Sequence, residues 1–455
     1  MRTDRYQQKR QVVSGKSILG IDPGKANHHG AILNASGAQQ GTSFGFSVSR
    51  EGFDHTLWKQ IEKRIDAYHP EDLVIAVETS CNLWKTIAHS CHGKGYTVAL
   101  VKPLTTYHSR SLMKHDFSRT DPKDAFLIAD NTQKGHYDVF QVFDPPLEAM
   151  HQLSITYDKL WKDRVKAKLR LRSFMETYFP EYLDAFAIDT KTSLYLLGKY
   201  FLPRHFLELD IEEEAPVLLR SSMRHHGRET LLDLREWAET SIGVPVCQVQ
   251  EDALRIVLNG WVEDLQGVEE QIKRVGKTLV GLAKQNPCFH ILISIPNINQ
   301  NLAAQFIAET MGPDRFDHFK QIEKLAGLNL RLSQSGHYAG RRRIAKIGNT
   351  RLRRILYQMT QLTAKAVPQV RCKFLRRQLK RKCYRKSIIA AIPQLLRLIV
   401  SLIKEGRCYK HKTNWNRELK KLERAYDKQE KAAPKRTYRN SHVRRQKLVE
   451  QNRAA

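Results

Sequence analysis

The sequence predicts an α/β domain, then a helical region, then a mainly α-helical C-terminal domain. Up to about residue 143, short apolar runs alternate with segments of helical spacing, which is typical of α/β domains. After Asp144-Pro145-Pro146 the apolar residues follow a heptad period instead. The chain has 455 residues, of which 41% are hydrophobic, and this length suits about three domains.

The N-terminal domain is placed at residues 15–143. Its predicted strands are SILGI (17–21), GAILNASG (30–37), GTSFGFSVS (41–49), DLVIAVETS (72–80) and YTVALVKP (96–103). Its predicted helices are GFDHTLWKQIEKRIDAYH (52–69), TIAHSCHGKG (86–95) and one that begins within SRTDPKDAFLIAD (118–130).

The second region, residues 144–286, contains two heptad segments separated by a stretch at about 181–250 that shows no clear pattern. The first segment spans 150–178, with one polar break at Arg164, and the second spans 254–282 without interruption. Two interpretations fit equally well. The segments are either core helices of an ordinary bundle or an antiparallel or intermolecular coiled coil that dimerises the protein.

The C-terminal region comprises a helical domain at 287–410 and a basic tail at 411–455. Residues 324–404 include 21 Lys or Arg and no acid, and the whole chain carries a net charge of +29. One-signed stretches of this kind favour phosphate binding, hence a nucleic acid. No apolar run of about 18 residues stands out, so no membrane span is expected. The polar start and the scattered cysteines indicate a cytoplasmic protein without structural zinc.

Four carboxylates form the first candidate site. Asp22 and Glu78 each follow a predicted buried strand, and Asp121 and Asp124 share one face of a predicted helix. Carboxylates that converge at a sheet edge repel one another unless cations compensate them, and Mg²⁺ prefers oxygen ligands. Two such ions about 4 Å apart suit phosphodiester chemistry. Each acid also has an ordinary explanation, as a turn residue, a strand end or a partner of the helix dipole.

The second candidate site is the basic segment at 325–358. Ser335 lies in a polar turn, and the nucleic-acid-binding candidates around it are Arg341, Arg342, Arg343, Lys346, Arg351, Arg353 and Arg354. A serine among guanidinium groups has the chemistry to attack a phosphodiester, because these groups stabilise the charged transition state. The plainer alternative is a loop serine beside cations that only hold phosphates. Ser333 is a second candidate nucleophile.

These motifs together resemble the IS110 insertion-sequence transposases, relatives of the Piv-type DNA invertases. GIDPGKANH, VIAVETS and SRTDPKDAFLIAD resemble the DEDD motif set of that family. LAGLNLRLSQSGHYAGRRRIAKIGNTRLRRILYQ and KSIIAAIPQLLRLIVSLIKEGRCYK resemble its C-terminal blocks. Residues 296–299 read PNIN where the family usually has PGIG, and the chain is long for the family.

The resemblance implies a RuvC-like, RNase H-type first domain whose four acids bind Mg²⁺, and a serine nucleophile that maps onto Ser335. It also implies a tetramer, arranged as a dimer of dimers, with composite sites. A noncoding bridge RNA would pair with donor and target DNA, and strand exchange would pass through a covalent serine–DNA intermediate. Two alternatives remain: a RuvC-type structure-selective nuclease without serine chemistry, and a non-enzymatic RNA-binding scaffold. The four intact acids argue against the scaffold.

Overall fold

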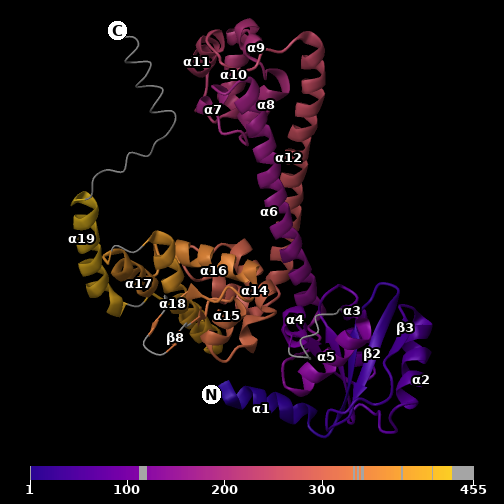
Figure 1. The fold of residues 1–455 in the computed structure, drawn as a ribbon. Helices are drawn as coiled ribbons and strands as arrows, with labels where there is room; N and C mark the ends of the chain where they lie inside the picture. The colour runs from indigo at the N-terminus through magenta and orange to yellow at the C-terminus, as the bar shows by residue number, and fades with distance from the viewer. Residues whose placement is uncertain are drawn as a thin grey trace. The chain divides into compact units, whose positions relative to one another are not determined.

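The structure is a computed structural model that describes residues 2–111, 120–331, 334–335, 338–339, 343–380, 383–411 and 413–432. The chain divides into two compact units, Met1–Val142 and Phe143–Ala455 (Figure 1). The first is an α/β unit and the second is mostly helical, which confirms the predicted fold class. The further domain boundaries at residues 286 and 410 stay predictions.

A six-stranded mixed sheet forms the first unit, in the order β3-β2-β1-β4-β5-β6. The strands are β1 (Ser17–Asp22), β2 (Asn27–Leu33), β3 (Phe44–Ser47), β4 (Leu73–Glu78), β5 (Thr97–Val101) and β6 (Asp138–Val139). The helices are α1 (Arg2–Val13), α2 (Leu57–Glu62) after a π-helical turn η1 (Gly52–Thr56), α3 (Trp84–Gly93), α4 (Pro103–Arg110) and α5 (Asp121–Gln133). The five predicted strands are present, whereas the helix predicted at 52–69 ends at Glu62. The short elements α1, α4 and β6 were not predicted.

The two faces of this sheet have separate cores because side chains alternate along each strand. Ile18 and Val74 pack with Ile128 of α5 on one face, and Leu19 and Ile75 pack on the other. Helix α5 approaches β1 so closely that a Cβ on residue 20 would lie 2.1 Å from the carbonyl oxygen of Ala125. Only glycine fits there, and this close contact fixes α5 against the end of β1.

An antiparallel pair of long helices runs through the second unit (Figure 1). The helices are α6 (Pro145–Tyr178) and α12 (Gln248–Ala283). Arg164 on α6 donates to Glu269 on α12 at 2.9 Å, and one end of the pair brings Phe174 edge-to-face with Trp261. Later residues of α6 therefore contact earlier residues of α12, so the two helices are antiparallel. The two heptad segments thus pack against each other within one chain, and association between copies stays a prediction.

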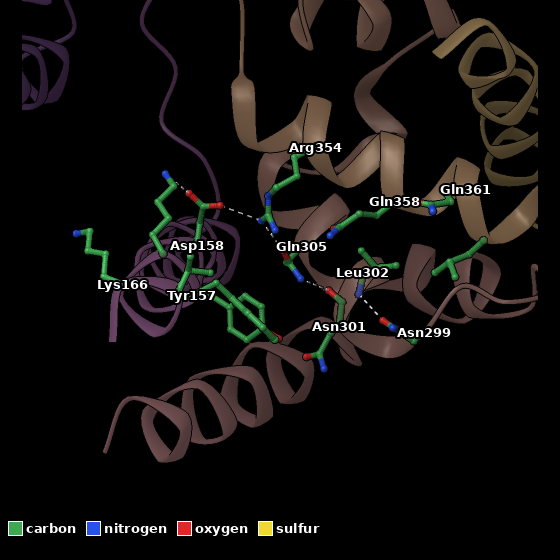
Figure 2. Close-up of a pocket in the computed structure, with 14 residues that line it drawn as sticks. Tyr157, Asp158, Lys166, Asn299, Asn301, Leu302, Gln305, Arg354, Gln358 and Gln361 are labelled. Carbon is green, nitrogen blue, oxygen red and sulfur yellow. Dashed lines mark hydrogen bonds and ion pairs between the residues drawn. The ribbon is translucent and has the colours of Figure 1, made fainter. Parts of the chain in front are cut away.

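The C-terminal elements pack around the other end of this helix pair. They are α13 (Pro287–Ile293), α14 (Gln300–Thr310), η2 (Pro313–Arg315), α15 (Phe319–Leu325), β7 (Leu330–Arg331), β8 (Gln334–Ser335), β9 (Tyr338–Ala339), β10 (Arg343–Ile344), α16 (Thr350–Thr363), α17 (Pro368–Gln378), α18 (Tyr384–Lys404), η3 (Thr413–Trp415) and α19 (Asn416–Ala432). Arg354 of α16 reaches Asp158 of α6 at 3.0 Å (Figure 2). The hairpin before α14 keeps a tight turn, because Asn297 adopts a left-handed φ of 66°.

Helix α18 is the central core helix of this part. Ile388, Ile392, Leu395 and Ile399 are fully buried in the large C-terminal core. Among the described residues, it is also the single helix that is long and apolar enough to cross a membrane. Half of its apolar stretch is buried inside the protein, and a core helix of a soluble protein can have the same length and composition.

The stretch at 181–250, which the sequence left without assignment, forms a cluster of short helices with its own core. The helices are α7 (Tyr182–Ala185), α8 (Lys191–Lys199), α9 (Pro203–Glu208), α10 (Ile211–Ser221) and α11 (Arg228–Glu239). Phe179, Tyr182, Phe201 and Phe206 are all essentially fully buried among them. The cluster packs on the end of the α6–α12 pair through Leu258 and its neighbours on α12.

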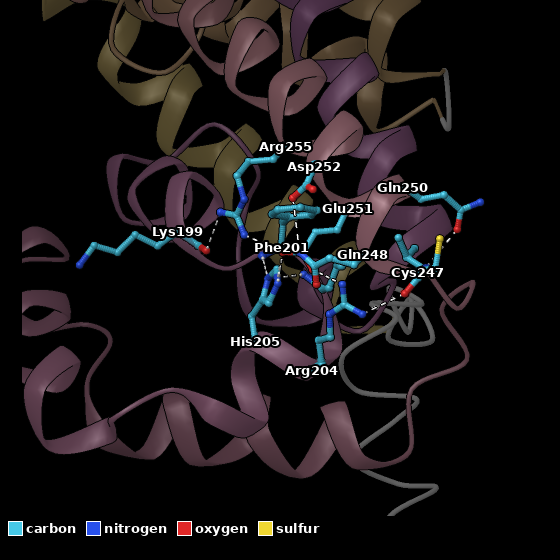
Figure 3. A network of polar contacts seen from close by, with 12 residues as sticks. Lys199, Phe201, Arg204, His205, Cys247, Gln248, Gln250, Glu251, Asp252 and Arg255 are labelled. Atoms are coloured by element: carbon cyan, nitrogen blue, oxygen red, sulfur yellow. Dashed lines mark hydrogen bonds and ion pairs between the residues drawn. The ribbon is translucent and has the colours of Figure 1, made fainter.

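A buried carboxylate ties this cluster to α12 (Figure 3). Glu251 accepts hydrogen bonds from Arg204, from His205 at 2.9 Å and from Arg255 at 2.8 Å. Burial favours a higher pKa for Glu251, but the hydrogen bonds outweigh it and lower the pKa to about 2. The carboxylate is therefore ionised at neutral pH, and it holds α9 against the start of α12.

Replacing Glu251 with glutamine is expected to lower the free energy of unfolding by about 2 kcal/mol, because two guanidinium groups lose a buried anionic partner. The measurement is chemical denaturation followed by circular dichroism at neutral pH. The matched control is Asp252→Asn, since Asp252 is an exposed neighbour on the same helix. Equal stability of the two variants would show that the network does not hold the cluster.

Candidate active site

Two of the predicted acids end neighbouring parallel strands. Asp22 is the last residue of β1, and Glu78 is the last residue of β4. The register pairs Ile21 with Val77, so Asp22 and Glu78 stand side by side at the end of the ladder. Both lie on the α5 face of the sheet, because Gly20, two residues before Asp22, faces α5.

The other two acids lie in the first turn of α5. The helix begins after Thr120, which is extended, and Pro122 near its start favours helix initiation. Asp121 and Asp124, three residues apart, occupy one face of this turn. Asp124 is buried, whereas the side chain of Asp121 is 64% exposed.

Two basic side chains contact these acids, and neither was among the residues predicted from the sequence. Arg110 at the end of α4 donates to both carboxylate oxygens of Asp124, at 2.7 and 2.6 Å. The Nδ1 atom of His29 lies 3.2 Å from Oδ2 of Asp121. No pattern distinguishes Arg110 among 76 Lys and Arg residues. His29 pairs with Asp22 across the β1–β2 hairpin, so the hairpin register was the signal that would have identified it.

The four carboxylates share one electrostatic environment. The pKa of Asp22 is raised to about 7, and burial is the largest cause. The negative charges of Glu78, Asp124 and Asp121 add to the rise, in that order, and the guanidinium of Arg110 opposes it. Among the described residues around these acids, negative charge therefore exceeds positive charge, as at sites where carboxylates bind a cation.

The donor set fits a hard divalent cation, because carboxylate oxygens are the ligands that Mg²⁺ prefers. Within the described ranges, however, no group of three or more His, Cys, Asp or Glu side chains has the spacing to hold a metal ion as it stands. The contacts give a reason. Arg110 engages both oxygens of Asp124, and Asp121 is turned toward His29.

Asp22→Asn is expected to stabilise the metal-free protein at pH 8. The folded-state pKa of Asp22 lies above its ordinary value of 3.8, so its contribution to stability is full below pH 3.8 and is lost as pH rises through about 7. Asparagine avoids that loss, which after discounting for partial exposure is about 1–2 kcal/mol. Calorimetry in EDTA should show a higher Tm for the variant at pH 8 and no gain at pH 4. The control is Asp66→Asn, an exposed aspartate of the same unit, which should show no difference at either pH.

The predicted serine lies in a small β-hairpin. Strand β8 pairs antiparallel with β9, with Ser335 opposite Tyr338. The backbone of Ser335 is thus at the end of a short ladder, and residues 336–337, where the polar turn is expected, lie outside the described residues. Ser333, Arg341 and Arg342 lie outside the described residues.

The described cations of this segment fall into two groups. Arg343 and Lys346 are exposed, and neither side chain has an ion-pair partner among the described residues. Arg353 and Arg354 instead make contacts within the protein. Arg353 donates to the carbonyl oxygen of Ala326 at 2.9 Å, and Arg354 pairs with α6 as described above.

Arg351 belongs to a buried polar centre that the sequence analysis did not anticipate. The side chain of Glu309 is fully buried and accepts from Nε of Arg351 at 2.8 Å and from Asn349 at 2.6 Å. Ser154 of α6 donates to the same carboxylate at 2.8 Å. This centre joins α6, α14 and α16, so the segment that presents Arg343 and Lys346 is anchored to the core.

Two protein-family models match the chain. One, described as a transposase and defined on the DEDD motif of IS110 elements, matches residues 19–180. The other, described as the transposase IS116/IS110/IS902 family, matches residues 289–374. A search of curated proteins gave no match. The two models together span more than half of the chain and include both the four acids and the serine segment. The chain therefore belongs to the IS110 family of transposases, enzymes that act on DNA in transposition and recombination.

Proposed function

We propose that this transposase cuts and exchanges DNA strands with a divalent-metal site at its four carboxylates and a serine nucleophile in its basic segment. The observation that carries the proposal is the convergence of Asp22, Glu78, Asp121 and Asp124 on one edge of the sheet, where Arg110 is the guanidinium that acts on them among the described residues. Such an excess of negative charge is what divalent cations compensate in phosphodiester chemistry.

The four acids would hold Mg²⁺, which when bound supplies activation of the attacking oxygen and stabilisation of the leaving oxygen. Glu78 and Asp124 are buried and so are fixed in position. Asp121 is exposed and faces His29, so it lies where an incoming strand has access. Arg110 provides the positive charge beside Asp124 in the metal-free protein, and it must share that carboxylate when a metal binds.

Ser335 is the proposed nucleophile. Its Oγ would form a bond to a DNA phosphorus while the bond from that phosphorus to a deoxyribose oxygen breaks. The hydroxyl proton would pass to a base, and the leaving oxygen would take up a proton. The number of phosphodiester bonds is conserved, so a hydroxyl of another strand can reverse the step and complete the exchange. The arginines that follow it in the sequence would stabilise the charged transition state.

The family membership and the positive charge of residues 324–404 support nucleic-acid partners. Donor and target DNA are the substrates, and we propose that a noncoding bridge RNA pairs with both. The 21 cations and absence of acids at 324–404 support a surface that holds phosphates. We further propose a cytoplasmic homo-oligomer arranged as a dimer of dimers, for which the family resemblance is the support.

Replacing Arg343 and Lys346 with alanine is expected to reduce the salt dependence of nucleic-acid binding by about two units of slope, because each phosphate contact accounts for about one. Both side chains are exposed and without ion-pair partners among the described residues. The measurement is affinity against salt concentration. The control is Lys273→Ala with Arg274→Ala, an exposed pair on α12. Equal slopes for both double variants would place the phosphates elsewhere.

The proposed function is tested with a plasmid that carries the coding region together with its natural flanking DNA. Wild-type protein expressed from it should generate new DNA junctions, detected by amplification and sequencing across the joined ends. In the purified reaction, EDTA should stop junction formation and Mg²⁺ should restore it. Junctions that form equally well in EDTA would contradict the metal step, and cut but never rejoined ends would favour a nuclease.

A further inference from the structure

A cleft in the second unit has a role that neither the four acids nor Ser335 accounts for (Figure 2). It lies between α6, the start of α14 and α16, and its volume is about 990 Å³. That is at the upper end of the range of about 300–1,000 Å³ for sites that bind compact ligands. It is open on one side, so a group carried on a longer chain has access to it.

One wall of the cleft is aromatic. Tyr157 and Trp161 stand one turn apart on α6, with ring centroids 6.3 Å apart. Tyr157 is buried, whereas Trp161 is 38% exposed and Val165, on the next turn, is 51% exposed. The guanidinium of Arg164 lies 5.4 Å from the Trp161 ring centroid and is itself paired with Glu269. The indole is thus held in place while part of it stays accessible, an arrangement suited to stacking a flat ring.

The opposite wall offers hydrogen-bonding groups without partners. Gln358 and Gln361 lie three residues apart on α16 and so on one face. Both are half-buried, and neither side chain has a hydrogen-bond partner among the described residues. The Nε atom of Arg354 is buried without a partner too. A buried N–H that lacks a partner costs free energy unless a ligand satisfies it, and the two half-buried amides are available to bond to the same ligand.

The mouth of the cleft is positively charged. Lys162, Lys166 and Arg354 line it together with one acid, Asp158. That acid is already engaged, by Lys162 at 2.8 Å and by Arg354 at 3.0 Å. Lys166 is in turn paired with Asp163 at 2.9 Å, so the three cations exceed these two acids by one charge. That excess favours an anionic ligand, and α16 belongs to the stretch of the chain that contains no acid.

We propose that this cleft binds an unpaired nucleobase of a nucleic-acid strand. A base offers a flat face for Trp161 and a donor–acceptor edge for Gln358 and Gln361, and the adjoining phosphate suits the lysines at the mouth. In a duplex both the face and the edge are occupied by neighbouring bases, so the cleft selects unpaired nucleotides. The inference rests on the proposed function in one respect, that this protein handles nucleic-acid strands.

The test measures binding of the full-length protein to fluorescein-labelled oligonucleotides: a single strand of mixed sequence, and a hairpin duplex of equal charge. Trp161→Ala should weaken single-strand binding about tenfold, the size typical for loss of one stacked base, and change duplex binding less than about twofold. The loss should be the same at about 50 and 200 mM salt, because stacking involves no counterion release. Gln358→Leu with Gln361→Leu should show a similar selective loss.

Two variants keep this test independent of folding. Trp161→Phe retains an aromatic face and should restore most of the single-strand affinity. A fold defect in the alanine variant would instead weaken the binding of the single strand and of the duplex together. Gln266→Leu with Gln271→Leu, on exposed positions of α12, is the matched control for the glutamine pair and should bind like wild type. Equal losses for single strand and duplex, or no loss at all, would overturn the proposal.

A strand containing 5-bromouracil identifies the site directly. Irradiation should crosslink it to a peptide of α6 that contains Trp161, and crosslinks confined to other parts of the chain would overturn the proposal. Repeating the binding measurements with RNA and with DNA single strands shows which of the two the cleft binds. A selective loss of affinity in the Trp161→Ala variant with either strand supports the proposal. Junction formation by the wild-type protein is scored separately. Wild-type protein that binds unpaired bases here but forms no junctions would refute the proposed function and leave the cleft assignment intact.

Discussion

Asp22→Asn is expected to lower the rate of strand cleavage at least about a thousandfold, the scale of a lost transition-state charge interaction, while DNA affinity stays within about twofold. The charges of the other three acids all act on Asp22, so its carboxylate is central to the cluster. Asparagine keeps the shape and one oxygen but removes the charge that a divalent cation requires.

The stability of the Asp22→Asn variant distinguishes a loss of catalysis from damage to the fold. The same substitution should make the metal-free protein more stable at pH 8, because it removes a buried negative charge and, as a smaller effect, the repulsion from the neighbouring carboxylates. The measurement is nicking of the plasmid that carries the natural flanking DNA, in Mg²⁺, with Asp66→Asn as the control. A variant that is more stable yet still cuts at the wild-type rate would remove Asp22 from the chemistry.

Ser335→Ala is expected to abolish the covalent protein–DNA adduct and strand exchange, with nucleic-acid binding unchanged. The hydroxyl is the atom that bonds to phosphorus, whereas affinity comes mostly from many phosphate contacts. The measurement is a denaturing gel of labelled DNA after reaction with wild-type protein, where the adduct migrates with the protein. Junction formation is scored in parallel.

Ser333→Ala is the internal control for that experiment. It should form both adduct and junctions, since the family resemblance maps the nucleophile onto the serine before Gly336. If only the Ser333 variant fails, the chemistry is right and the assigned position is wrong. If the Ser335 variant still cuts DNA and wild type gives no adduct, water is the nucleophile and the chain is a RuvC-type nuclease.

The strand pattern of the first unit was predictable because burial and alternation act locally. Asp22 and Glu78 follow apolar runs, and parallel pairing of those runs is enough to bring their carboxylates to one edge. The arrival of α5 at the same edge depends on a longer-range feature, the close contact at Gly20 that a sequence shows only as one more glycine.

Partners that come from elsewhere in the chain were not predictable. Arg110 contacts Asp124 through tertiary packing, and nothing in its own neighbourhood marks it, whereas His29 could be found only from the register of the β1–β2 hairpin. Glu309 is similar: it reads as an ordinary helical acid, yet it is fully buried and takes up Arg351, one of the predicted phosphate ligands. The helices between residues 181 and 250 escaped prediction because each is short and its core is assembled from all of them.

The central claim, a divalent-metal site at the four acids, is tested most directly by calorimetric titration of Mg²⁺ or Mn²⁺ into the full-length protein near pH 7. In buffers of different ionisation enthalpy, saturable binding should release a substantial fraction of a proton per site, because Asp22, with a pKa of about 7, is partly protonated until the metal binds. Asp22→Asn should bind far more weakly and release no proton, and Asp66→Asn should behave like wild type. Absence of saturable binding, or equal binding by Asp22→Asn, would contradict the metal site.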